Sequence, residues 1–254
     1  MKKQITALMK TLTATLMATF LISAQALAIT PEGILSKADD NSIYQSIKYI
    51  GTMTINKGTR KKPRIKTFNA IARGNDKAYI EFTNPGDRGT KYLKLGDELW
   101  VKGAYAERAD KISGHKLRES MMGSDYSYED SMDNEKLIDK YNPALTGSEN
   151  IGNKECYILE LNAKVKKITY SRLIMWVDKE QFVPLKIQYF ALSGMLLKEM
   201  VVQEVKTIKG KYFPVKVKME DKQREGSYTL FEMESVVLDE PVNESVFSKK
   251  NLEK

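Results

Sequence analysis

Few residues of this sequence could perform acid–base or nucleophilic chemistry. His115 is the sole histidine and Cys156 the sole cysteine. A Ser–His–Asp triad needs its histidine in a rigid pocket, yet His115 lies in Ser-Gly-His-Lys, which is typical of a mobile turn. Cys156 lies in a stretch that alternates as a strand does, so we expect a buried structural thiol. We therefore predict that the protein is not an enzyme.

Three carboxylates in a short polar stretch are the candidates for a metal site. Asp125, Glu129 and Asp130 offer the oxygen ligands that calcium prefers. Their spacing lacks the glycine and the terminal glutamate of an EF-hand, and a single histidine excludes a histidine-based zinc site. We expect these carboxylates to cap turns, with calcium binding as the alternative. The sequence has no phosphate-binding glycine loop, and we predict no cofactor.

The first 28 residues have the features of a secretory signal. Lys2 and Lys3 give a positive start, residues 11–24 are apolar and uncharged, and Ala26-Leu27-Ala28 supplies the small residues of a cleavage site. We predict cleavage after Ala28 and a periplasmic location, with an uncleaved N-terminal anchor as the alternative. No cysteine follows the predicted cut, so we expect no lipid anchor.

Residues 29–254 are predicted to form a single domain. Their net charge is +5, because the signal segment contains three lysines and no acid. This mild excess is spread over many charged residues, unlike the concentrated stripe of a nucleic-acid binder, and we predict no nucleic-acid partner. It would favour contact with anionic headgroups or an acidic partner.

The dominant hydrophobic period is two, which indicates antiparallel β-structure. Residues 49–55 alternate as a strand does, and Gly96-Asp97 is predicted to join strands 91–95 and 98–102 in a hairpin. Six further candidate strands separated by short turns predict a meander; they are 156–161, 172–177, 183–190, 196–205, 212–219 and 227–233. A helix is expected to start at Thr30-Pro31-Glu32, and residues 104–139 are expected to be loop with short helices.

Two of the strands separate apolar from polar residues, which predicts a sheet with one apolar face. Val183, Leu185, Ile187 and Tyr189 are expected to point one way, with Lys186 and Gln188 opposite them. The apolar residues of the second strand are Phe213, Val215, Val217 and Met219. With so little helix to cover it, the apolar face could line a cavity, although an ordinary sandwich core would produce the same alternation.

Several segments, in order along the chain, resemble the LolA-like family of outer-membrane lipoprotein-sorting proteins, in its broad branch. They are Glu98-Leu-Trp-Val101, the basic segment 108–118, Met121 to Asp130, Glu155-Cys156-Tyr157, Ile174 to Asp178, Val183 to Lys186 and Phe213-Pro214. The resemblance implies a mainly β fold, a half-open antiparallel β-barrel with short lid helices. It also implies a cavity that shields acyl chains; the lid arginine and cavity residues of the founding carriers are not carried over.

These observations together predict a periplasmic carrier of lipoprotein acyl chains or other lipid-like cargo. The candidate lipid-binding residues are Val183, Leu185, Ile187, Tyr189, Phe213, Val215, Val217, Met219, Trp100, Met121 and Met122. Met121 and Met122 could equally plug the protein's own core. The expected partners are acyl chains, an inner-membrane transporter and, transiently, the membrane surface. The alternative is an accessory or sensor module that binds an envelope membrane protein.

A cluster of basic residues marks a predicted hairpin tip. It consists of Lys57, Arg60, Lys61, Lys62, Arg64 and Lys66. Such a run is typical of a solvated turn that protects an edge strand. Docking to anionic lipid or to an acidic face of a transporter is the functional alternative.

Overall fold

The computed structural model describes residues 29–58, 62–133 and 135–254. The predicted signal segment and its cleavage site, together with Arg60 and Lys61, lie outside the described residues. Residues Pro31–Lys254 form one compact unit. Within the described part of the chain, no helix has the length and the apolar character needed to cross a bilayer.

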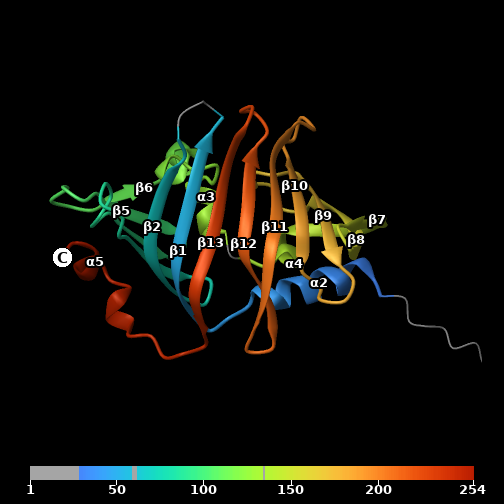
Figure 1. Cartoon of the computed structure of the whole chain (residues 1–254), viewed down its shortest axis with the longest axis horizontal. Helices are drawn as coiled ribbons and strands as arrows, with labels where there is room; N and C mark the ends of the chain where they lie inside the picture. The colour runs from blue at the N-terminus through green and yellow to red at the C-terminus, as the bar shows by residue number, and fades with distance from the viewer. Residues whose placement is uncertain (1–28, 59–61, 134) are drawn as a thin grey trace, which may run out of the picture. The chain divides into compact units, whose positions relative to one another are not determined.

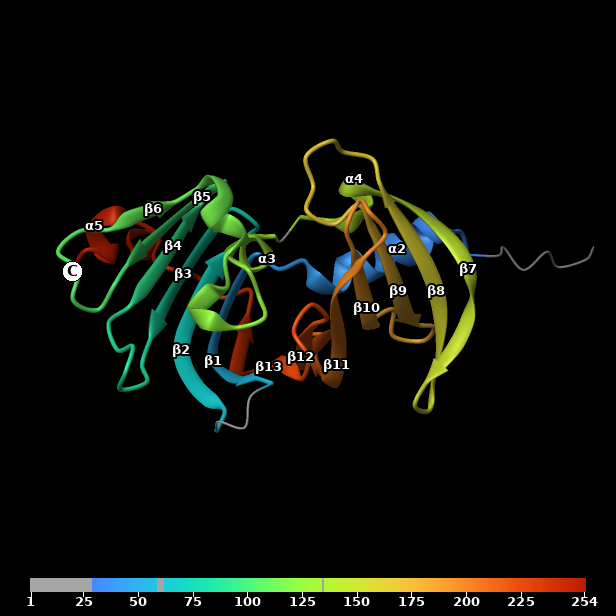
Figure 2. The ribbon, with the colours of Figure 1, turned by 90° about the horizontal axis from the view of Figure 1, so that it is seen from above.

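Thirteen antiparallel strands form one sheet, in the order β6-β5-β4-β3-β2-β1-β13-β12-β11-β10-β9-β8-β7. The strands are β1 (Ser46–Lys57), β2 (Arg64–Arg73), β3 (Lys77–Phe82), β4 (Lys91–Leu95), β5 (Glu98–Lys102), β6 (Asp110–Ile112), β7 (Tyr141–Ile151), β8 (Lys154–Ala163), β9 (Arg172–Asp178), β10 (Pro184–Phe190), β11 (Leu196–Ile208), β12 (Lys211–Asp221) and β13 (Ser227–Leu238). The sheet curls without closing, and its edges are β6 and β7 (Figure 2). This confirms the predicted half-open barrel.

Consecutive strands are neighbours in the sheet except at one place. Strands β1 to β6 form one meander and β7 to β13 form another, which confirms the meander predicted for the second half. The two meanders join where β1 pairs with β13, so that the first and last strands lie at the middle of the sheet (Figure 1). Strands far apart in the sequence therefore build the centre of the concave face.

The predicted hairpin of β4 and β5 has the predicted bounds, and its turn residue Gly96 has a φ of 55°. Alternation along β1 is also as predicted, with Gly51, Met53 and Ile55 buried and Ile50 exposed. Gly51 is required by packing, because a Cβ atom there would lie 2.3 Å from Cζ of Phe68. The ring of Phe68 on β2 lies over this glycine, in the space that a side chain at position 51 would take.

Helices are few and lie mainly on the concave side of the sheet (Figure 2). Helix α2 (Pro31–Ser42) starts as predicted and buries Ile34, Leu35 and Ala38. The stretch between β6 and β7, expected to be loop with short helices, contains η1 (Gly114–Arg118), η2 (Met121–Gly123), α3 (Tyr128–Met132) and α4 (Leu137–Lys140). Residues 114–133 and 135–140 are called the lid segment below. The chain ends with η3 (Glu244–Val246) and α5 (Lys249–Leu252).

Candidate functional site

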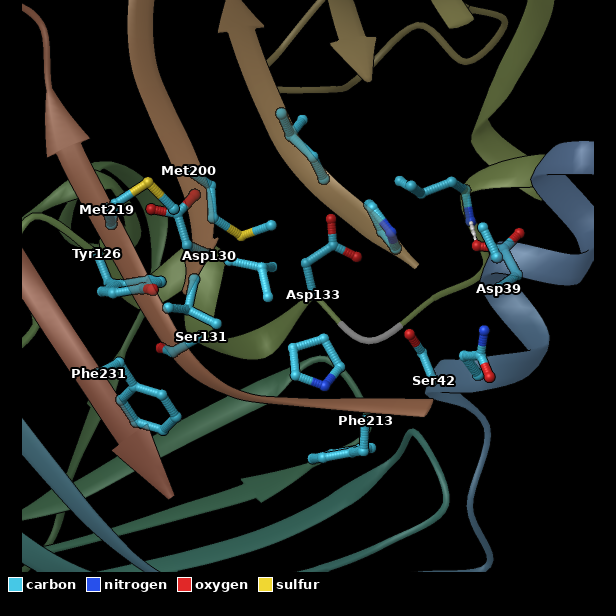
Figure 3. A pocket seen from close by; sticks show the side chains of 18 of the residues that line it. Asp39, Ser42, Tyr126, Asp130, Ser131, Asp133, Met200, Phe213, Met219 and Phe231 are labelled. Atoms are coloured by element: carbon cyan, nitrogen blue, oxygen red, sulfur yellow. Dashed lines mark hydrogen bonds between the residues drawn. The ribbon is translucent and has the colours of Figure 1, made fainter. Parts of the chain in front are cut away.

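A cavity of about 500 Å³ lies against the concave face of the sheet. Strands β1 to β3 and β9 to β13 supply one wall, and helix α2 and the lid segment supply the other. Figure 3 shows Met200, Phe213, Met219 and Phe231 on the strand side and Asp130 and Asp133 on the lid side. The cavity therefore exists only where the curled sheet, the first helix and the lid come together.

The strand side of the cavity is apolar and adaptable. Five methionines line it, namely Met53, Met175, Met200, Met219 and Met233, and Met121 lines the cavity from the lid segment. Unbranched thioether side chains adjust to irregular ligands, so this wall suits a flexible hydrocarbon. Tyr49, Tyr126 and Tyr189 also line the cavity, and burial raises the pKa of each phenol above its ordinary value. These three phenols therefore stay protonated and place no charge on the wall.

Charged groups gather on the helix and lid side, where Asp39 and Asp133 have protein partners. Asp39 of α2 accepts hydrogen bonds from the backbone N–H groups of Leu137, at 3.1 Å, and Ile138, at 3.0 Å. Burial is the main cause that raises the pKa of Asp39. Asp133 forms an ion pair with Lys140. The cavity is thus amphipathic, with one apolar wall and one polar rim.

Seven of the eleven predicted lipid-binding residues line this cavity. They are Val183, Ile187, Tyr189, Phe213, Val217, Met219 and Met121. Strand β10 with the residue before it, strand β12 and the lid segment bring them together, although they lie in separate parts of the sequence. Their role in lipid binding stays a prediction, but their shared location is an observation.

The other four predicted residues lie elsewhere. Leu185 packs with Cys156 and Trp176, because a register shift between Pro184 and Lys186 breaks the predicted alternation of β10 at this residue. Val215 lies in the cluster of Ile47 and Leu238.

Trp100 and Met122 are held by contacts of their own. Trp100 packs against a cluster that includes Phe247 and Leu252 near the C-terminus, and the ammonium of Lys249 lies 3.4 Å from its ring centroid. Met122 has a φ of 53°, and its sulfur accepts a hydrogen bond from the Tyr92 hydroxyl at 3.1 Å. Met122 therefore packs against the protein's own core, the alternative considered for this pair, and Met121 is buried in the same cluster and also lines the cavity.

Two of the three carboxylates considered for calcium are held by hydrogen bonds within the protein, namely Asp125 and Asp130. Asp125 is 1% exposed and accepts hydrogen bonds from the hydroxyls of Ser227 and Thr229 on β13, the latter at 2.7 Å. Asp130 closes a capping box with Ser127 at the start of α3, as expected of a turn-capping carboxylate. Among the described residues, no three or more His, Cys, Asp or Glu side chains are grouped so as to hold a metal ion.

Two acidic side chains, Asp125 and Asp130, fasten the lid segment to the second meander. Asp125 attaches it to β13 through Ser227 and Thr229. Asp130 forms an ion pair with Lys198 of β11 and accepts a hydrogen bond from the Tyr170 hydroxyl at 2.6 Å. Because Tyr170 and Lys198 belong to the second meander and the lid leaves the first, these contacts hold the cover across the cavity.

Removal of either partner of Asp130 is expected to loosen the lid. Tyr170→Phe and Lys198→Met should each cost about 1 kcal/mol of lid closure, so that amides of α3 exchange roughly fivefold faster. Hydrogen exchange followed by mass spectrometry at residues 128–131 measures this. Tyr105→Phe, at a side chain that is 99% exposed, is the matched control. Unchanged exchange in both variants would show that these contacts do not hold the lid.

Comparison with known proteins places this geometry in a family. A family model whose description reads "-like: Uncharacterized protein" matches residues 74–254. A DUF1329 family protein from Desulfovibrio piger is 27% identical, with a TM-score of 0.79, over 87% of this chain and 97% of that one. A LolA superfamily protein from Nitrosomonas europaea is 23% identical, with a TM-score of 0.72, over 88% of this chain and 100% of that one.

This chain belongs to the family that this model describes, and its fold is LolA-like. A domain from Vibrio parahaemolyticus, described as an outer membrane lipoprotein-sorting protein, shares the fold at 21% identity and a TM-score of 0.76, over 87% of this chain and 97% of that one. No curated protein is significantly similar to the chain. The resemblance predicted from the sequence is thereby confirmed, and so is the LolA-like fold.

Part of the cavity wall of this LolA-like chain was absent from the predicted set. Helix α2 contributes Ala38 and Asn41, and the segment between β8 and β9 contributes Tyr170. These segments have no strand period, so alternation could not assign them a face. The available signal was composition, since tyrosines recur in polar stretches at Tyr126, Tyr128 and Tyr170 where solvated loops rarely need them.

The remaining candidates for chemistry lie outside the cavity of this LolA-like fold. Cys156 is buried as expected, and burial raises the pKa of its thiol, which keeps the reactive thiolate scarce. His115 lies in η1, a short 3₁₀ helix at the surface. In the basic cluster, Lys66 pairs with Asp87 at 2.5 Å, whereas Lys62 and Arg64 are exposed.

Proposed function

We propose that this protein is a periplasmic, non-enzymatic carrier that holds the acyl chain of a lipoprotein or another lipid-like molecule in the cavity. The observation that carries the proposal is the cavity itself: an apolar wall of aliphatic, aromatic and methionine side chains beneath a fastened lid. A hydrocarbon tail needs a dry, adaptable concavity and no catalytic group. The amphipathic rim leaves a place for the polar end of the cargo.

The cavity volume supports a cargo of one tail. A methylene group is about as large as a water molecule, which takes ~30 Å³ in the liquid, so the 500 Å³ cavity matches roughly sixteen such groups. At about 0.8 kcal/mol for each buried methylene, one long chain supplies on the order of 10 kcal/mol before the cost of ordering. A molecule with several tails would leave the others outside.

The signal-like segment at the start of the sequence supports a periplasmic location. Its positive start, apolar core and Ala26-Leu27-Ala28 site are typical of exported proteins. Carriage between membranes, with a membrane protein as donor and transient contact with the lipid surface, is consistent with the family in which the chain is found.

Native mass spectrometry of the gently purified protein tests the proposal. The expected result is a 1:1 complex with a single-tailed amphiphile, and uptake of one palmitate per chain after delipidation. A protein that is always empty and takes up no fluorescent fatty acid would overturn the carrier function. Uptake of two or more palmitate molecules with equal affinity by one protein molecule would contradict the capacity for one tail and would leave the carrier function intact.

A further inference from the structure

Several loops leave the sheet at the same end. Strand β1 ends at Lys57 opposite Ser227, where β13 begins, and Asp221 at the end of β12 lies opposite Lys198. The tips of the β1–β2, β10–β11 and β12–β13 hairpins accordingly point the same way (Figure 1). The segment between β8 and β9 and the turn between β3 and β4 leave at this end too. The described residues of these loops, 62–66, 83–90, 164–171, 191–195 and 221–226, are called the tip surface.

Large apolar side chains are exposed on the tip surface. Leu192 is 92% exposed, Ile65 62%, Met195 50% and Val165 41%. These four make up half of the eight large hydrophobic side chains that are exposed in the described part of the chain. Leu192 and Met195 lie on the two sides of the β10–β11 turn, Ile65 lies at the start of β2, and Val165 lies between β8 and β9. The four side chains are therefore separate apolar points and do not form one continuous patch of the kind that a partner protein would cover.

Positive charge is concentrated on the same loops. The tip surface carries a net charge of +6, whereas the rest of residues 29–254 carries −1. Lys62, Arg64, Lys166 and Lys167 are exposed, and none of them pairs with a carboxylate among the residues that the structure describes. The protein is therefore polarised, and its whole positive excess lies at one end of the sheet.

We propose that the tip surface docks on an anionic lipid bilayer. Separate apolar points among unpaired lysines are the combination that binds such a surface, because the side chains enter the interfacial region while the cations meet lipid phosphates. A nucleic acid would instead be met by several exposed aromatic rings for stacking. The loop 103–109, which leaves the sheet at this end beside the 83–90 turn, offers one such ring, that of Tyr105, and no other Phe, Trp or Tyr side chain is exposed among the described residues.

The tip surface is connected to the cover of the cavity. Tyr170 belongs to the tip surface and donates its hydroxyl to Asp130 of the lid, and Lys198, close behind the Met195 tip, forms the ion pair with Asp130. Docking through these loops would bring the bilayer next to the groups that hold the lid. The docking itself does not rest on the carrier function and can be tested without cargo.

Co-sedimentation of the purified protein with lipid vesicles tests the docking. We expect binding to vesicles in which phosphatidylglycerol replaces a third of the phosphatidylcholine, and little binding to phosphatidylcholine alone. Binding should weaken as salt is raised from about 0.1 M to about 1 M, which shortens the Debye length from ~10 Å to ~3 Å. Lys166→Glu with Lys167→Glu, and Leu192→Ser with Met195→Ser, should each lower partitioning by about tenfold or more.

Matched variants distinguish binding through the tip surface from nonspecific electrostatic or hydrophobic binding. Lys209→Glu with Lys250→Glu makes the same charge change away from the tip surface, and Leu145→Ser removes an exposed leucine on the edge strand β7. Both should bind as the unaltered protein does. Equal losses in the control variants, or no binding of the unaltered protein to anionic vesicles, would overturn the proposal. Acyl-chain loading should stay unchanged in all these variants, so a failure of docking is distinguishable from a failure of carriage.

Discussion

Val217→Trp is expected to lower the affinity for a single-tailed amphiphile roughly 50-fold, if the indole displaces three methylenes worth about 0.8 kcal/mol each. Val217 is buried on β12 and lines the cavity between strands β11 and β13. A larger side chain at this point occupies space that the cargo needs. Titration with a fluorescent fatty acid, together with the lipid occupancy seen by native mass spectrometry, measures the loss.

The neighbouring residue on the same strand provides the control. Lys216 faces away from the cavity and pairs with Glu232 across the outer face at 2.7 Å. Lys216→Trp should therefore leave the affinity within about twofold, because a surface ion pair contributes little. Ile187→Trp, on the cavity wall of β10, is a second test in case Val217→Trp folds poorly, and it should lower the affinity for the amphiphile to a similar extent. Full affinity in both folded cavity variants would mean that cargo binds elsewhere.

Asp125→Ala is expected to destabilise the fold by about 3 kcal/mol, which for a domain of this size lowers the Tm by roughly 6–12 °C. The substitution removes the acceptor of the Ser227 and Thr229 hydroxyls from a buried place. It also removes a negative charge that counteracts burial at Lys57, where burial is the main cause that lowers the pKa of the ammonium. Thermal unfolding followed by circular dichroism measures the change.

Two further substitutions show whether the carboxylate itself is responsible. Asp125→Asn keeps a hydrogen-bond acceptor without the charge, so its Tm should lie between that of the unaltered protein and that of Asp125→Ala. Asp97→Ala, in the exposed turn between β4 and β5, should change the free energy of unfolding by less than about 0.5 kcal/mol. A small effect of Asp125→Ala, equal to that of Asp97→Ala, would show that the lid is not fastened at this point.

Strand alternation predicted most of the sheet because apolar side chains predominate on the concave face and polar ones on the outer face. The strands around Val183 and Phe213 and the β4–β5 hairpin were found this way, with bounds close to those observed. Strand β7 was missed, since it lies at the edge, is mostly exposed and contains Pro143. An edge strand buries little on either face and tolerates a proline, so its sequence carries no alternation.

The cavity could be predicted only in part from the sequence. Six candidate residues line it because they follow the alternation of faces along a strand, and Met121 was chosen as one of two adjacent methionines in a polar stretch. Leu185 does not line the cavity, since one register shift moves this residue away from its neighbours. Trp100 came from the family resemblance, and its packing near the C-terminus depends on contacts between remote parts of the chain. The partners of Asp125 and Asp130 likewise lie about 100 and 70 positions away, beyond the reach of local pattern.

The pairing of β1 with β13 has a consequence for how the protein is made. Lys57 and Ser227 are opposite each other although 170 positions separate them, whereas every other ladder joins consecutive strands. Loop closure costs more as separation grows, so the hairpins should assemble first and this long-range seam last. The cavity is bounded by strands on both sides of the seam. A chain that lacks its final strand β13 therefore cannot close this seam, and its cavity is completed only after Leu238 has been synthesised.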